Sequence, residues 1–171
     1  MFYFAQLPVF GELAPETELD RSVQPPVLTR LSCRIDMLPW SDIFAISPCV
    51  IVSARLARRL DETNCSGYEI REGIFNASDA FHHFHGFQAV PELRWLHVSG
   101  RAYTDDFGFA EGTKLIVSDK AKATIEVGPH RDVSFLAGDK PPSDEEIESM
   151  VFADVAKVAE ELRARKRDLQ N

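Results

Sequence analysis

A short β-branched run followed by a serine occurs twice in this chain, at residues 50–53 and 115–118. β-Branched residues favour strands. A serine hydroxyl at the next position can accept a hydrogen bond from an amide in the first turn of a helix. Apolar residues then recur three and seven places after each serine, so they would share one helix face. They are Leu56, Leu60, Ala121 and Ile125. The sequence therefore predicts two strand–serine–helix units, whose helices begin at Ser53 and Ser118.

Short apolar or alternating runs predict further strands. They are residues 1–8, 43–46, 68–71, 94–100 and 133–136. The proline-rich, acidic stretch 11–27 predicts an exposed loop. Residues 27–37 fit either a strand or a short helix, and residues 74–93 predict mixed loop and strand. Residues 105–112 predict a loop.

A helix is predicted from Ser143, because Ser143 and Glu146 have the spacing of a capping box and an apolar stripe follows. At 1.5 Å per residue it would be about 40 Å long. The 171 residues suffice for one domain with an ordinary core. The predicted fold class is α+β: a single domain, 1–171, with a mixed, mainly antiparallel sheet and two short helices in a body of residues 1–142, and a long C-terminal helix at 143–171.

The formal net charge of −8 argues against a nucleic-acid partner, because phosphate binding needs clustered lysine and arginine. The three cysteines, Cys33, Cys49 and Cys65, have no CxxC spacing and suit free thiols in a reducing compartment. The N-terminus lacks the features of a signal peptide, and no apolar run is long enough to span a membrane. These observations predict a soluble cytoplasmic protein without a membrane partner.

No nucleophile elbow, phosphate-binding loop, dinucleotide fingerprint or HExxH motif occurs in the sequence. Ser53 and Ser118 are interpreted as helix caps, and the cysteines as buried, inert thiols. The prediction is that the protein is not an enzyme and has no cofactor.

The densest histidine cluster is His82, His83 and His85, set among phenylalanines. Imidazoles this close could bind a transition metal, and Asp79 could add a carboxylate ligand. The alternative is an aromatic–histidine segment that faces solvent or a partner. No second ligand group at a suitable spacing completes a known site, so no metal is predicted. A small metal-dependent enzyme built on these histidines stays the alternative function.

An acidic–aromatic segment between the two repeated units offers a contact surface for a basic protein. Its acids would steer association, and its aromatic side chains would supply interface anchors. The predicted partner-binding residues are Tyr103, Asp105, Asp106, Phe107, Phe109 and Glu111.

The strand, Val-Ser, helix and Gly-turn pattern resembles small acidic bacterial immunity proteins of polymorphic-toxin and type VI secretion systems. The matching stretches are Ile51 to Glu69 and Leu115 to Gly128, and the segment from Leu93 to Gly100 is also similar. The resemblance covers about residues 43–136. It implies a cytoplasmic antitoxin that binds and neutralises a cognate protein toxin, and it carries over no catalytic residues. A further alternative is an adaptor subunit that forms a homodimer through the C-terminal helix.

Overall fold

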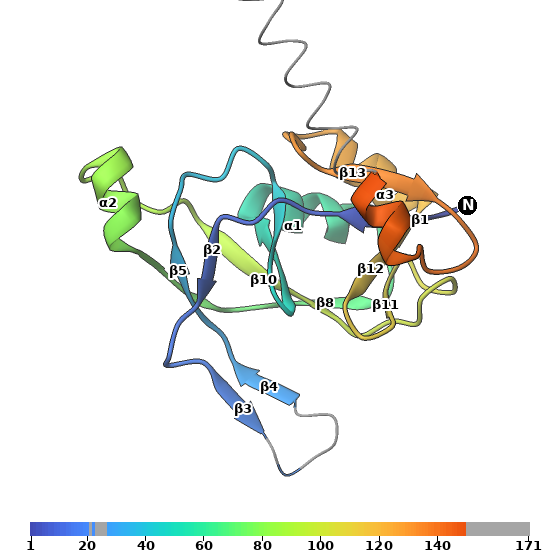
Figure 1. Ribbon diagram of the computed structural model, residues 1–171, viewed down its shortest axis with the longest axis horizontal. Helices are drawn as coiled ribbons and strands as arrows, with labels where there is room; N and C mark the ends of the chain where they lie inside the picture. Colours follow the sequence, from blue (N-terminus) through green and yellow to red (C-terminus); the bar gives the residue numbers. More distant parts are fainter. Residues whose placement is uncertain (21, 23–26, 150–171) are drawn as a thin grey trace, which may run out of the picture. The chain divides into compact units, whose positions relative to one another are not determined.

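The computed structural model describes residues 1–20, 22 and 27–149. The chain divides into two units, Met1–Asp139 and Lys140–Asn171, which are described separately. The first unit is built mostly from short strands (Figure 1). None of the helices within the described residues has the length and apolarity that a membrane crossing requires.

One four-stranded sheet forms around the first predicted unit. Strands β6 (Ile43–Ile46) and β7 (Cys49–Ser53) form a hairpin, and helix α1 (Ala54–Glu62) follows β7 directly. Strand β8 (Tyr68–Arg71) lies at the far edge, and β10 (Leu93–Val98) is inserted between β7 and β8. All three strand pairings are antiparallel.

A second four-stranded sheet forms around the second predicted unit. Strands β11 (Phe107–Ala110) and β12 (Lys114–Ser118) form the hairpin, and helix α3 (Asp119–Glu126) follows β12. Strand β13 (Ser134–Ala137) lies at the far edge, and the N-terminal strand β1 (Phe2–Gln6) is inserted between β12 and β13. These pairings are also all antiparallel.

The two sheets are therefore two copies of one module, each a hairpin, a helix and two further strands in the same spatial order. The registers agree, because the capping serine of each helix lies opposite the first residue of the inserted strand. Ser53 lies opposite Leu93, and Ser118 lies opposite Phe2. In the first module the chain runs from β8 to β10 through residues 72–92, which we call the insert. In the second module the inserted strand comes from the start of the chain, so no such segment joins β13 to β1.

The insert contains strand β9 (Ile74–Ala77) and helix α2 (Asp79–His85). Strand β9 joins a three-stranded sheet with β2 (Gly11–Leu13) and β5 (Ser32–Ile35), in the order β2–β5–β9. The β5–β9 pairing is parallel. Strands β3 (Glu18–Asp20) and β4 (Val27–Arg30) form a separate two-stranded ribbon.

Both faces of the first sheet are buried, as the alternation along β7 shows. Val50 and Val52 belong to a core shared by both modules, in which Leu56 and Leu60 of α1 meet Ala121 and Ile125 of α3. Cys49 and Ile51, which alternate with these valines, belong to a second core formed with Phe81 of α2 and strands β5 and β10. Because successive strand residues point to opposite faces, an unbroken apolar run is what a strand buried on both faces requires.

The two predicted strand–serine–helix units are confirmed. Ser53 caps α1 by accepting from the amide of Leu56, and Ser118 caps α3 by accepting from the amide of Ala121. The predicted strands at residues 43–46 and 68–71 match β6 and β8. The ambiguous segment 27–37 forms two strands, β4 and β5, and the predicted loops contain strands β2, β3 and β11.

The predicted fold class is wrong in its sheet and in its helices. The strands of the described residues form four separate sheets instead of one. A third helix, α2, occupies residues predicted as mixed loop and strand. The described residues show no long C-terminal helix: helical conformation there covers residues 144–149, and the rest of that prediction, residues 150–171, lies outside them. The capping box itself is present, since the amide of Glu146 donates to the Ser143 hydroxyl and the Glu146 carboxylate accepts from the Ser143 amide.

Candidate functional site

A buried carboxylate, Asp42, fixes the start of helix α1. It is 3 % exposed and accepts from the Ser53 hydroxyl at 2.8 Å. It also accepts from Arg55 at 2.8 Å and from Arg59 at 2.7 Å. The loop after α3 closes over it, because a Cβ on Gly128 would lie 2.3 Å from an Asp42 oxygen. We call these residues the Asp42 cluster.

Asp106 holds the equivalent place in the second module. It accepts from the Ser118 hydroxyl, from the Ser66 amide at 2.8 Å and lies 3.5 Å from the Lys120 amine. Ser66 belongs to the loop after α1, so each carboxylate is covered by the loop that follows the other module's helix. Asp106 was predicted to bind a partner. The structure shows it holding two modules together, with its side chain 17 % exposed.

The pKa values of Asp42 and Asp106 are both held below the usual aspartate range. Burial alone would raise the pKa of Asp42, but hydrogen bonds from Arg55, Ser53 and Arg59 outweigh it. Burial would likewise raise the pKa of Asp106, and the hydrogen bonds from Ser118 and Ser66 reverse that effect. Each carboxylate is therefore more acidic in the folded than in the unfolded chain, and its ionised form stabilises the fold.

This acidity predicts how stability depends on pH. A lowered folded-state pKa contributes stability that is present above the unfolded pKa, near 4, and is lost as pH falls through the folded pKa. We expect the free energy of unfolding to fall steeply below about pH 4. In Asp106→Asn the same fall should be smaller, because one contributing carboxylate is gone. Urea denaturation at about pH 7 and pH 3 measures both, and an equal fall in the two proteins would contradict the assignment.

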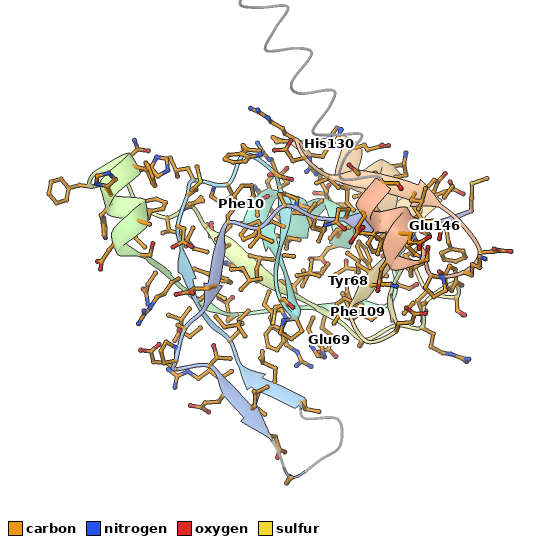
Figure 2. All side chains as sticks on the ribbon, in the orientation of Figure 1. Phe10, Tyr68, Glu69, Phe109, His130 and Glu146 are labelled. Carbon is orange, nitrogen blue, oxygen red and sulfur yellow. The ribbon has the colours of Figure 1, made fainter. Side chains whose placement is uncertain are left out.

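The other residues of the predicted acidic–aromatic surface do not form one patch. Phe107 is fully buried in the shared core against Tyr68, so it is not available to a partner. Phe109, a member of the predicted set, is half-buried against that core. Tyr68, which is not a member, is half-buried there too, and both are labelled in Figure 2. The half-buried Tyr103 packs edge-on against Phe2.

The two remaining acids of that set lie in turns. Asp105 accepts from the Arg101 amide at 2.7 Å, closing a turn. Glu111 is exposed and lies 2.8 Å from Lys114. Of the six residues, Glu111 is the one that is exposed, and it pairs with Lys114.

The histidine segment forms most of helix α2. The sequence predicts mixed loop and strand for these residues, not a helix. Ser78 caps the helix by accepting from the Phe81 amide at 3.2 Å, and it donates to Asp36 at 2.6 Å. Gly86 ends it with a φ of +62°, a conformation that glycine adopts at little cost. The helix therefore has defined ends despite its length of seven residues.

Two inward side chains hold α2 in place. Phe81 is fully buried in the second core. His85 packs on the Phe81 ring at 4.9 Å and its Nε2 accepts from the Leu38 amide at 3.2 Å. His85 thus has a structural role, because it ties α2 to the backbone at Leu38.

The outward face of α2 exposes two large aromatic side chains. Phe84 is 65 % exposed, and Phe87, just after the helix, is fully exposed. His82 and His83 are exposed beside them. Figure 2 shows side chains extending from α2 away from the rest of the ribbon. We call Phe84, Phe87, His82 and His83 the α2 surface.

The histidines do not come together as metal ligands. Among the described residues, no group of three or more histidine, cysteine, aspartate or glutamate side chains has the arrangement to hold a metal ion. His82 Nδ1 lies 3.0 Å from the Gly86 carbonyl and His85 bonds the Leu38 amide, so two of the three rings are committed to the backbone.

The buried thiols are poor nucleophiles. Burial raises the pKa of Cys33 to about 12 and that of Cys49 to about 11. Since the thiolate is the reactive form, both are inert near neutral pH.

An open groove of about 470 Å³ lies between α1 and α3. Its two cationic side chains, Arg59 and Lys120, already pair with Asp42 and Asp106. These two side chains therefore already take part in the contacts that join the modules.

Comparison of the chain with protein-family models, with curated proteins and with solved structures gave no match.

Proposed function

We propose that this protein binds another protein through the α2 surface, and that it acts as a cytoplasmic immunity protein that neutralises a cognate toxin. The observation that carries the proposal is the exposure of Phe84, on a helix that is itself fixed to the core, and of Phe87 in the turn that follows it. The role proposed is binding, without catalysis.

Exposed aromatic side chains on a rigid element are well suited to be anchors of an interface. Burying one phenylalanine against a partner contributes about 1.5–3 kcal/mol. Because Phe81 and His85 already fix α2, little further ordering of the backbone opposes that gain.

The place of α2 in the repeated architecture supports the same surface. The two modules share strand order, register and capping serine, so these features serve the scaffold. The insert is where the first module departs from the second. Function is commonly carried by such elaborations on a stable scaffold.

Charge supports a basic partner. The chain carries a formal net charge of −8, which would speed association with a cationic protein and slow it with an anionic one. Because Glu111 is exposed, it suits long-range steering of a cationic partner better than a role as a buried interface contact.

The proposal is tested with the protein that the adjacent gene encodes, which the immunity role requires to be the toxin. We expect isothermal titration to show a one-to-one complex, and co-expression to restore growth of cells that produce the toxin. Absence of binding at micromolar concentrations, with growth unrestored, would rule out the immunity role.

A further inference from the structure

We propose that the partner adds an extended segment as a new strand along the free edge of β9, next to the α2 surface. This inference rests on the proposed function and specifies how the partner is held. Such strand addition is a recurring mode of peptide recognition, in which backbone hydrogen bonds supply much of the affinity.

The printed backbone bonds define which edge of β9 is free. The amide of Ile74 donates to the Leu31 carbonyl at 3.0 Å, and the amide of Ser78 donates to the Ile35 carbonyl at 3.0 Å. Backbone groups of successive strand residues point to opposite edges. The amides and carbonyls of Phe75 and Ala77 therefore point away from β5.

No strand pairs with that edge among the residues that the structure describes. The four residues of β9 are Ile, Phe, Asn and Ala, without a charge or a proline. The edge strand β8 differs, since it carries Glu69 and Arg71, paired at 2.6 Å. Charged residues on an edge discourage added strands, so β8 is protected and β9 is open.

The open edge is continuous with the α2 surface, because Ser78 follows β9 and caps α2. The Ile74 side chain, 38 % exposed, adds apolar surface at the other end of the strand. The exposed acids Glu72 and Asp79 flank β9 in the chain, and Glu72 lies 3.4 Å from Arg94 while its side chain stays 83 % exposed. The segment that fits is extended and apolar, with basic residues near its ends.

Amide hydrogen exchange with the adjacent-gene toxin tests this directly. In the free protein, the amides of Phe75 and Ala77 should exchange fast and that of Asn76 slowly. In the complex, protection of Phe75 and Ala77 should rise on the order of 100-fold. Binding with unchanged exchange at these two amides would overturn the added strand and leave the proposed function standing. Absence of binding would overturn both.

A proline variant supplies a second measurement. Ala77→Pro removes an outward amide, and prolines are tolerated at free strand edges. It should weaken toxin binding about tenfold, the value of one hydrogen bond, while Ala77→Ser, which keeps the amide, should bind as the wild type does. Equal binding by a folded Ala77→Pro would count against the inference. If that variant does not fold, the exchange measurement on the wild type decides.

Discussion

Replacing Asp42 with alanine should lower the free energy of unfolding by about 3–5 kcal/mol. Asp42 is 3 % exposed and pairs with two arginines. Removing it leaves Arg59, whose side chain is 18 % exposed, without its carboxylate. Breaking one partner of a buried pair leaves an uncompensated charge, which costs more than the pair contributed. Urea denaturation of both proteins at neutral pH gives the difference.

Glu69→Ala is the matched control, because Glu69 also pairs with an arginine but its side chain is 60 % exposed. Solvent screens such a pair, so the free energy of unfolding should change by less than about 1 kcal/mol. Equal effects of the two substitutions would show that Asp42 does not hold the modules together.

If the proposed function holds, the double substitution Phe84→Ala, Phe87→Ala should weaken binding of the adjacent-gene protein by about 100- to 1,000-fold. The two side chains are the large exposed aromatics of the α2 surface. Because neither lies in the core, the free energy of unfolding should change by less than about 1 kcal/mol. Titration calorimetry gives the affinity, and urea denaturation gives the stability.

Val127→Ala controls for the loss of exposed apolar area, since Val127 is 73 % exposed at the end of α3. It should bind the toxin as the wild type does. If the double variant also binds normally, the α2 surface is not the anchor of the interface.

Local signals in the sequence sufficed to predict the two scaffold helices. The serine before each helix and the apolar spacing after it act within one or two helical turns. They could not predict which strands make up the second module. Its inserted strand β1 lies more than 100 residues before its neighbours β12 and β13. That pairing depends on long-range burial rather than on local pattern.

Helix α2 was missed because its composition is aromatic and rich in histidine, which are weak helix formers. A usable signal was present: Ser78 as cap, Asp79 in the first turn and Gly86 after the last residue. The interpretation of residues 81–87 as a segment facing solvent or a partner agrees with the exposure of His82, His83, Phe84 and Phe87. It is wrong for Phe81, which is fully buried, and His85 is half-buried. Phe107 was misassigned because a phenylalanine after two aspartates reads as a loop, while its pairing with Val117 places it in a strand.

The most direct measurement of the proposed binding surface is site-specific photo-cross-linking to the adjacent-gene protein. A photoreactive phenylalanine analogue would replace Phe87 on the α2 surface, Glu111 in the acidic turn, or Val127 on α3. All three positions are solvent-exposed, so each can report a neighbour. We expect a covalent complex from position 87 and none from position 127. Cross-linking from position 111 without any from position 87 would contradict the α2 surface as the binding site.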